Sequence, residues 1–406
     1  MQKVTLPQEK AISAYKDLVS KDILEELHQL SSRLKGKKVV EINATSFGGG
    51  VAELLRSQVP LMRELGIDVD WYVLPPDDRF FTTTKQLHNC LQGICPLHPE
   101  IDLDYYQAYS DGIAKHLPEA DIYILHDPQT LGLAKHLKAK HVVWRCHIDL
   151  SDADTATHDW LKQHYQHITK AIFSLEAYVH GLDRAKTAIV HPAIDPFNKK
   201  NRLLTQEECR VIIARQAIDQ NRPYILQVSR FDKFKDPLGV LHIFAELKKR
   251  VPDLQCVLMG NYATDDPEGI EYYKVVHTLA KKVDPYNAHI IVQADDLTIN
   301  AFQRQAVVVI QNSTKEGFGL TVTEALWKKK IVFSRPVGGI ALQIINNKTG
   351  YYLTDNTNTS AHKIAEVLSD DSANQKHITQ TAHQLVRKRF ITPIMVRDYL
   401  RVYSTE

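Results

Sequence analysis

The feature that most constrains the fold of this chain is a regular alternation of short apolar runs with amphipathic, helix-spaced segments. The runs that we predict as buried strands lie at 39–42, 69–74, 122–125, 141–146, 224–228, 254–259, 289–293, 306–310 and 331–333. The helices that we predict between them lie at about 20–34, 51–65, 205–216, 238–249 and 272–282. Strict alternation is typical of parallel sheets joined by right-handed crossovers, so the expected class is α/β.

The length of 406 residues leaves room for two domains, each with its own core. A proline-punctuated stretch at 191–197 separates the two series of elements and is predicted as a linker. We therefore expect two Rossmann-like, doubly wound parallel-sheet domains at 1–197 and 198–406, facing each other across a cleft. The last helix, at about 390–406, is a candidate to pack back on the first domain.

A glycine-rich turn in the second series joins the strand at 306–310 to a helix. Glu316 lies in this turn, Gly317 and Gly319 follow it, and Glu324 is predicted about one turn into the helix. Glycine lets the backbone approach a ligand closely, and the first N–H groups of a helix can bind a phosphate. Two carboxylates here would address two parts of one ligand. Solvated glutamates beside an ordinary turn would give the same pattern.

The first series carries a second glycine turn, formed by Gly48, Gly49 and Gly50 after its first strand. In open α/β sheets, ligands bind outside the carboxyl ends of the strands, which is where this turn is predicted. The glycines do not match the G-x-G-x-x-G pattern, so a nicotinamide dinucleotide is not supported. Glycines that serve tight packing alone are the alternative.

Polar clusters follow two more strands of the first series. His126, Asp127 and Gln129 come directly after one strand, and His147 follows the next. Because parallel strands share a carboxyl edge, we expect these residues to converge near the first glycine turn. No spacing typical of a metal-binding helix accompanies them, so sugar hydroxyls are the better match.

Two cations follow the first strand of the second series. Arg230 offers directional hydrogen bonds and Lys235 a point charge, a combination suited to a diphosphate. Either residue alone would be read as part of a solvated loop. Together with Glu316 and Glu324 they predict transfer from a nucleoside diphosphate sugar, which needs charge stabilisation for the departing phosphates.

Composition excludes other classes of partner. The formal net charge of +2 is nearly balanced, so neither a nucleic acid nor a membrane surface is expected. The basic run Lys328 to Lys330 is predicted to be a solvated helix end. No apolar run has the length of a signal peptide or of a membrane span, and a cytoplasmic location is expected.

The five cysteines are an odd number without paired metal-ligand spacing. Cys90 and Cys95 are five positions apart, and no second pair completes a zinc site. We therefore predict buried free thiols in a reducing compartment.

The motif residues resemble the retaining glycosyltransferases of family 4, which have the two-domain GT-B fold. The resemblance rests on Arg230 and Lys235 followed by Glu316 and Glu324 with seven residues between them. A closer resemblance, to the trehalose glycosyltransferring synthases, covers nearly the whole chain. It is carried by the stretches 43–53, 126–129, 144–151, 227–232, 265–269 and 316–325.

The resemblance implies a role for each residue on the donor side. Glu316 would bind hydroxyls of the donor glucose, Glu324 those of the ribose, and the two cations the diphosphate. The backbone contacts that it implies for the donor come from Gly48, Gly49, Gly50, Gly317, Phe318, Gly319 and Leu320.

On the other side, His147 is similar to the histidine that contacts the donor sugar near its reacting carbon. Asp127 is similar to the acceptor-site carboxylate, and His126 and Gln129 are expected beside it. The implied catalytic set is therefore His147 and Asp127 with Arg230, Lys235 and Glu316.

The implied reaction moves glucose reversibly from ADP- or UDP-glucose to free glucose, forming trehalose. Double displacement needs a carboxylate against the reacting carbon, and the implied contact of Glu316 is with remote hydroxyls. We therefore predict front-face transfer, in which a phosphate oxygen takes the proton of the acceptor. No metal is required, although stimulation by Mg²⁺ and a homodimeric state both stay open.

Three other functions fit part of the pattern. A retaining trehalose phosphorylase would share many of these motifs, but it would leave Glu324 without a ribose. A family 4 glucosyltransferase with a different acceptor would share the donor half. A sugar-nucleotide sensor would keep the pocket without turnover.

The chain departs from the family pattern at three positions. Family members commonly carry Gly and Pro where this chain has Lys329 and Ile331, so the end of the motif helix is expected to be built differently. Thr130 also replaces the usual proline after the His126 cluster, which weakens the prediction of an acceptor pocket there.

Overall fold

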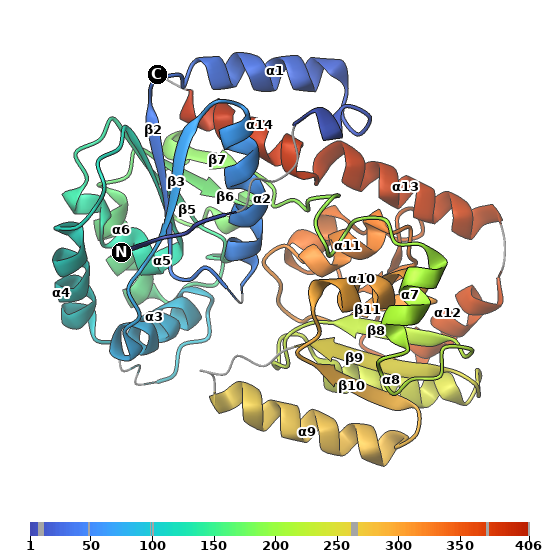
Figure 1. Cartoon of the computed structure of the whole chain (residues 1–406). Helices are drawn as coiled ribbons and strands as arrows, with labels where there is room; N and C mark the ends of the chain where they lie inside the picture. The colour runs from blue at the N-terminus through green and yellow to red at the C-terminus, as the bar shows by residue number, and fades with distance from the viewer. Residues whose placement is uncertain are drawn as a thin grey trace. The chain divides into compact units, whose positions relative to one another are not determined.

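The computed structural model describes residues 1–6, 12–47, 49–97, 99, 101–260, 267–370 and 373–404. The chain forms two compact units, one of residues 1–193 with 392–406 and one of residues 194–391. The division falls a few residues before position 197, where the sequence predicted it, and the last helix belongs to the first unit. The predicted α/β class is confirmed, because each unit is a largely parallel sheet flanked by helices (Figure 1).

The sheet of the first unit has the strand order β1-β3-β2-β4-β5-β6-β7. Its strands are β1 Gln2–Lys3, β2 Lys38–Asn43, β3 Asp68–Val73, β4 Ile122–His126, β5 His141–Arg145, β6 Lys170–Phe173 and β7 Thr187–Ile189. All neighbours are parallel except β1, an edge strand that pairs antiparallel with β3 and that the sequence did not predict. The inner strands are almost fully buried, as expected for a parallel sheet covered on both faces.

Helices cover both faces of this sheet. They are α1 Lys21–Ser32, α2 Gly50–Glu64, α3 Asp78–Leu91, α4 Leu103–Ala114, α5 Asp127–Leu131, α6 Thr155–Tyr165 and α14 Thr392–Tyr403. Short 3₁₀ turns lie at Ile12–Tyr15, Ala134–His136, Glu176–Tyr178 and Arg184–Lys186. The C-terminal α14 packs against α1 and α2, and Figure 1 shows these three helices together. A core that includes Leu87, Tyr106 and Trp144 lies beneath α3, α4 and α6.

The sheet of the second unit is entirely parallel, with the strand order β10-β9-β8-β11-β12-β13. Its strands are β8 Tyr224–Val228, β9 Gln255–Gly260, β10 Ala288–Val292, β11 Val308–Gln311, β12 Val332–Ser334 and β13 Tyr351–Tyr352. Its helices are α7 Gln206–Ile213, α8 Pro237–Lys248, α9 Pro267–Val283, α10 Asp296–Gln305, α11 Leu320–Trp327, α12 Thr357–Ser369 and α13 Ala373–Arg389, with a 3₁₀ turn at Gly338–Leu342. The predicted strands and helices of this half all occur, with ends displaced by a few residues.

The basic run that follows α11 is not the solvated helix end that the sequence predicted. The Lys328 side chain is buried, and its Nζ donates to Asn201 Oδ1 at 2.9 Å and to Gln303 Oε1 at 2.7 Å. Burial also lowers the pKa of Lys330 to about 8. Only Lys329 is exposed. Three adjacent lysines look alike in sequence, but the end of a helix turns them toward different surroundings.

Lys329 occupies the left-handed position of a Schellman motif, with φ at +57°. The N–H of Lys330 donates to the carbonyl of Ala325 at 3.0 Å, and the N–H of Lys329 donates to that of Leu326 at 3.0 Å. The expectation that this helix end is built differently is therefore wrong. The usual glycine geometry is kept, and a lysine adopts it.

Replacing Lys329 with glycine is expected to raise the free energy of unfolding by about 1 kcal/mol, because glycine adopts positive φ without steric cost. Urea unfolding of both proteins measures the difference. The matched control, Lys363→Gly inside α12, is expected to lower stability by a similar amount. Equal destabilisation by both substitutions would contradict the assignment.

Cys90 and Cys95 form a disulfide, so the prediction of free thiols is wrong for this pair. Gly93 adopts a left-handed conformation, with φ at +77°, and turns the chain back after α3 so that the two cysteines meet. Cys146, Cys209 and Cys256 are free and buried, as predicted.

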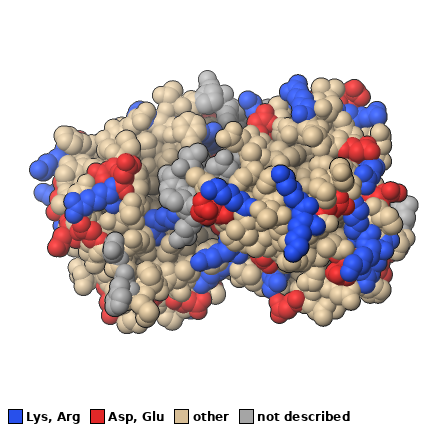
Figure 2. All heavy atoms as spheres, turned by 90° about the horizontal axis from the view of Figure 1, so that it is seen from below, with Lys and Arg blue, Asp and Glu red and all other residues tan. Residues whose placement is uncertain are grey.

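Two observations on the described part of the chain bear on partners. No helix in it has both the length and the apolar character needed to cross a bilayer. Acidic and basic side chains are interspersed over the face drawn in Figure 2, in keeping with the nearly balanced formal charge.

Candidate active site

The glycine turn of the second unit is fixed by Gly319, the N-cap of α11. Its φ of +86° is left-handed, and a Cβ at this position would lie 2.8 Å from Ile340 Cγ1. The turn therefore needs glycine for both its backbone angle and its close packing. The first N–H groups of α11 follow this turn, and N–H groups at the start of a helix suit an anion.

Phe318 is predicted to offer its backbone to a donor, and its side chain is engaged within the second unit. The ring is buried and packs edge-on against Phe390, with 5.3 Å between ring centroids. Gln343 Nε2 donates to the carbonyl of Phe318 at 2.7 Å, and the N–H of Gly339 donates to that of Gly317 at 3.3 Å. These contacts hold the turn in one conformation.

Lys235 and Glu316 meet in an ion pair, with 2.6 Å between Lys235 Nζ and Glu316 Oε2. The two side chains are only 16% and 13% exposed, so water screens the pair weakly. Ser313 Oγ also donates to Glu316 Oε2, at 3.3 Å. Gln227 at the end of β8 donates through Nε2 to the carbonyl of Lys235 and fixes the loop. The fold thus brings together two of the predicted donor-site residues.

Arg230 lies in the same loop but in a different environment. Its side chain is 64% exposed, and its NH2 lies 3.3 Å from Asp232 Oδ2. An exposed guanidinium keeps its donors available to a ligand, whereas the ammonium of Lys235 is held by Glu316. The two predicted cations therefore share a loop without sharing a partner.

Glu324 is placed as predicted, one turn into α11, but its carboxylate is 1% exposed and engaged by protein. Gln303 Nε2 donates to Glu324 Oε2 at 3.2 Å, and Lys200 Nζ lies 3.6 Å from Oε1. Gln303 in turn accepts from Lys328 Nζ. The sequence reading missed Lys200, Gln303 and Lys328, since nothing in their local pattern signals a shared carboxylate.

The glycine turn of the first unit is only partly described, because Gly48 lies outside the described residues. Gly49 is the N-cap of α2, with an extended backbone, and Gly50 is the first residue of that helix. Both are exposed, and a Cβ on Gly49 would meet no atom within 4 Å. Packing therefore does not require glycine at position 49.

The polar cluster at the carboxyl edge of β4 and β5 does converge. His126 Nδ1 lies 3.0 Å from His147 Nε2, and the backbone N–H of His147 donates to Asp127 Oδ1 at 2.7 Å. Asp127 has a left-handed backbone, with φ at +60°, as the first residue of α5. Gln129 Oε1 is buried and has no hydrogen-bond partner among the described residues. The sequence prediction of this cluster is therefore correct in placement.

Thr130, which replaces the usual family proline, has a structural role at this site. Its side chain is fully buried, and Oγ1 donates to the carbonyl of His126 at 2.8 Å. Trp144 Nε1 donates to the carbonyl of Asp127 at 3.1 Å. These two bonds hold the turn that carries Asp127.

The electrostatics of this cluster favour a neutral His147 ring and a weakly acidic Asp127 carboxyl. Burial raises the pKa of Asp127 to about 6, against the N–H of His147 and the charges of His126 and Arg145, which lower it. Burial, with the charges of Arg145 and His126, lowers the pKa of His147 well below its usual range. His147 is therefore neutral near pH 7, and one of its ring nitrogens is a hydrogen-bond acceptor.

Behind the cluster lies Glu41, which the sequence reading did not single out. It sits on β2 and is fully buried, and its Oε2 lies 2.7 Å from His126 Nε2. The signal that would have found it is a glutamate inside an apolar run predicted to be a buried parallel strand. Such a carboxylate needs partners inside the protein.

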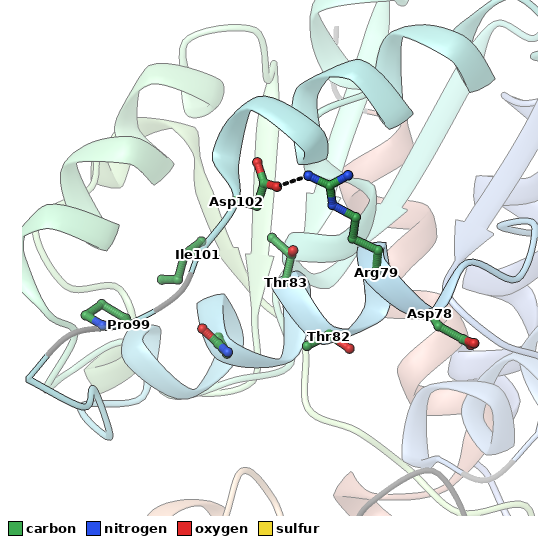
Figure 3. A pocket seen from close by; sticks show the side chains of 8 residues that line it. Asp78, Arg79, Thr82, Thr83, Pro99, Ile101 and Asp102 are labelled. Carbon is green, nitrogen blue, oxygen red and sulfur yellow. Dashed lines mark hydrogen bonds and ion pairs between the residues drawn. The ribbon is translucent and has the colours of Figure 1, made fainter.

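The cavity drawn in Figure 3 lies elsewhere in the first unit, along α3 and the segment before α4. Its volume is about 560 Å³, and its lining residues are Asp78, Arg79, Thr82, Thr83, Gln86, Pro99, Ile101 and Asp102. The charged groups of Arg79 and Asp102 pair with each other at 2.5 Å. None of the predicted site residues lines this cavity, and its principal charges are already matched.

No group of three or more His, Cys, Asp or Glu side chains arranged to hold a metal ion occurs within the residues that the structure describes. In the loop after β8, Lys235 and Arg230 supply positively charged side chains.

Comparisons with known proteins identify the family to which both halves of the chain are similar. Residues 41–180 match the family model "Trehalose synthase, N-terminal domain", and residues 210–384 match "Glycosyl transferases group 1". The chain is 37% identical to the trehalose synthase of Rubrobacter xylanophilus and 37% identical to that of Thermococcus litoralis. Both alignments cover 98% of this chain and 97% of the relative.

The chain is also similar to a more distant sequence relative and to solved structures of low sequence identity. A trehalose phosphorylase of Pleurotus pulmonarius is 28% identical over 90% of this chain but only 57% of its own length. The trehalose-6-phosphate synthase OtsA superimposes with a TM-score of 0.74 at 12% identity, covering 91% of this chain and 99% of that one. Anabaena HepE gives a TM-score of 0.70 at 13% identity over the same shares. The predicted GT-B fold is confirmed.

Proposed function

The chain belongs to the trehalose synthase family of glycosyltransferases, and from this premise we propose that it transfers glucose from a nucleoside diphosphate glucose to free glucose. The product is trehalose, the anomeric configuration is retained, and the reaction runs in both directions. ADP- and UDP-glucose are the donors expected to serve.

The observation that carries the proposal is the largely shielded Lys235–Glu316 pair beside the N-terminus of α11. A carboxylate suits the hydroxyls of a glucosyl group, while an ammonium and helix N–H groups suit the phosphates that leave it. The exposed guanidinium of Arg230 adds donors in the same loop. A glucosyl diphosphate presents both kinds of group in one molecule.

The mechanism that we propose uses the leaving phosphate as the base. Lys235 and Ser313 already occupy one oxygen of Glu316, which suits it to hold hydroxyls and not to attack the reacting carbon. The acceptor hydroxyl therefore attacks from the face that the diphosphate leaves. A phosphate oxygen takes its proton, while Lys235 and Arg230 stabilise the negative charge that develops on the leaving group.

The first unit would supply the groups for the sugars. His147, neutral and held by His126, accepts a hydrogen bond from a sugar hydroxyl. Asp127 and the unpartnered Oε1 of Gln129 accept from the acceptor glucose. No organic cofactor takes part in this scheme, and the two cations perform the task that a metal performs in other transferases.

A donor panel tests the proposal. ADP-, UDP- and GDP-glucose are each incubated with free glucose, and the product is identified by its α,α linkage in proton NMR. The reverse reaction uses trehalose with ADP or UDP and, separately, with inorganic phosphate. Formation of glucose 1-phosphate without any nucleotide sugar would establish a phosphorylase instead, and binding of donor without product would establish a sensor.

The pKa of about 6 for Asp127 predicts an acid limb in kcat/KM. The carboxylate is the form that accepts from a hydroxyl, so kcat/KM falls as the pH drops through 6. The contribution of Asp127 to folding stability has the opposite pH dependence. Its carboxyl binds a proton more tightly in the folded state than in the unfolded state, so the free energy of unfolding rises as the pH falls from 6 toward 4. Rates and melting curves from pH 4.5 to 8 check both signs.

Asp127→Asn serves as the control for this limb. Its residual activity is expected to lose the pH dependence near 6, since the amide does not titrate there. If kcat/KM of Asp127→Asn still falls below pH 6, or if kcat/KM of the wild-type chain falls only near pH 4, Asp127 is not the group that causes the acid limb.

A further inference from the structure

Glu41, His126 and His147 form a continuous hydrogen-bonded chain that starts in the core of the first unit and ends at the sheet edge. Glu41 Oε2 lies 2.7 Å from His126 Nε2, and His126 Nδ1 lies 3.0 Å from His147 Nε2. The two imidazole planes differ by only 14°, so the rings continue one another. Glu41 and His126 are 0% and 2% exposed, whereas His147 is partly exposed.

The surroundings of Glu41 indicate an ionised carboxylate. Besides His126, its Oε1 accepts from Gln58 Nε2 of α2 at 2.8 Å and from the Tyr403 hydroxyl of α14 at 3.4 Å. Two donors, from Gln58 and Tyr403, on one buried carboxylate suit the charged form, which only accepts. The nearby guanidinium of Arg145 donates instead to Ser174 Oγ and the carbonyl of Val190, so it does not compete for this carboxylate.

A protonated His126 would donate from both ring nitrogens and would leave His147 protonated at Nδ1. With His126 neutral, the Glu41 acceptor places the proton of His126 on Nε2, and its Nδ1 presents a lone pair. His147 must then donate from its Nε2–H to that lone pair. The Nδ1 of His147 is left unprotonated, and it has no hydrogen-bond partner among the described residues.

We propose that Glu41 and His126 are positioning residues that fix the tautomer of His147, so that its Nδ1 is a hydrogen-bond acceptor for a substrate sugar hydroxyl. The inference rests on the proposed function for the identity of the ligand, but the proton arrangement is a property of the free protein. The backbone of His147 is held independently by Asp127. Glu41 therefore determines which nitrogen of the His147 ring is protonated, whereas Asp127 holds the backbone of His147 in position.

This arrangement explains why a glutamate occurs inside a buried apolar strand. A carboxylate without partners is costly to bury, and a valine at this position would pack in the same sheet at no such cost. In return, His147 has one defined acceptor nitrogen, which binds a hydroxyl donor at the sheet edge. An exposed, unsupported imidazole would divide between two tautomers.

The direct test is the protonation of His147 in the ligand-free full chain. Histidine-selective ¹⁵N labelling distinguishes the two neutral tautomers by the shifts of the ring nitrogens, and His147→Gln identifies the signal. We expect a protonated Nε2 and an unprotonated Nδ1. A protonated Nδ1 would overturn the proposal whatever the enzyme's substrate, whereas failure of the proposed function would leave this spectrum unchanged.

Activity gives an independent readout. Glu41→Leu removes every acceptor, and its kcat/KM is expected to fall at least about tenfold, the loss for leaving one substrate hydroxyl unpaired. Glu41→Gln keeps an acceptor oxygen and is expected to recover part of that loss. Tyr403→Phe is the matched control: it removes another polar contact to the same carboxylate, and its kcat/KM is expected to stay within twofold of the wild-type value.

A double-mutant cycle separates positioning from packing. If Glu41 acts through His147, Glu41→Leu costs nothing further in a His147→Ala background. Additive losses, or a loss in Tyr403→Phe equal to that in Glu41→Leu, would assign Glu41 to general core stability and overturn the proposal. Melting temperatures identify any variant that does not fold. If Glu41→Leu does not fold, the ¹⁵N spectrum of the wild-type chain decides between the two outcomes.

Discussion

Lys235→Ala is expected to lower kcat for glucosyl transfer by about 10²- to 10³-fold, the range for losing one fixed electrostatic group at a leaving group. The ammonium is only 16% exposed, so its charge acts in a poorly screened environment. Its removal also leaves the Glu316 carboxylate without its nearest cation. The measurement is the initial rate at saturating donor, with product quantified directly.

Lys233→Ala is the matched control, since Lys233 lies in the same loop, with its ammonium 5.7 Å from the centre of the Phe234 ring. Its kcat is expected to stay within about twofold, because its ammonium lies over the Phe234 ring and the proposed mechanism gives it no phosphate to hold. Lys235→Arg retains the charge but not the compact ammonium, and it is expected to give an intermediate rate. Equal losses in Lys233→Ala and Lys235→Ala would show that the loop's total charge matters and not the buried pair.

Arg230→Ala is expected to lower kcat by about 10²-fold at saturating donor, because the guanidinium would bind the phosphates most strongly as they depart. If the group bound substrate and transition state equally, only KM would rise. Comparing the fall in kcat with the rise in KM therefore shows whether Arg230 binds the phosphates already in the bound substrate or mainly in the transition state. Calorimetric titration of the variant with the nucleoside diphosphate measures separately how much Arg230 contributes to binding before the reaction.

Arg222→Ala provides the comparison at the opposite end of β8. Arg222 precedes this strand, and its Nε donates to the carbonyl of Asp253, far along the strand from the Arg230 loop. Its removal is expected to change stability slightly and kcat not at all. Turnover by Arg230→Ala close to the wild-type rate at saturating donor would remove Arg230 from the mechanism.

The buried carboxylate of Glu324 would have to bind a ribose while it keeps its protein partners. Its carboxylate already accepts from Gln303 and lies near Lys200, so a nucleoside would share an occupied group. Gln303 also accepts from Lys328, which couples the carboxylate to the end of α11. Substitutions in this group of four residues are therefore expected to be non-additive.

The alternation of elements was predictable because it depends on local periodicity. The strand at 224–228 was predicted with the bounds that β8 has, and the motif helix begins where its glycine turn ends. The convergence of His126, Asp127 and His147 followed from one rule, that parallel strands share a carboxyl edge. Errors occurred where burial or chain reversal decided, as at Lys328 and at the Cys90–Cys95 bridge.

The sequence by itself determined the α/β class, the two glycine turns and the residue types available for sugar and phosphate. Only the tertiary structure decided which of them act together. Lys235 and Glu316 are 81 positions apart, and Glu41 and His126 are 85 apart, so no local pattern relates them. Strand order brings each pair within hydrogen-bonding distance, because it sets the neighbours of a buried side chain independently of sequence separation.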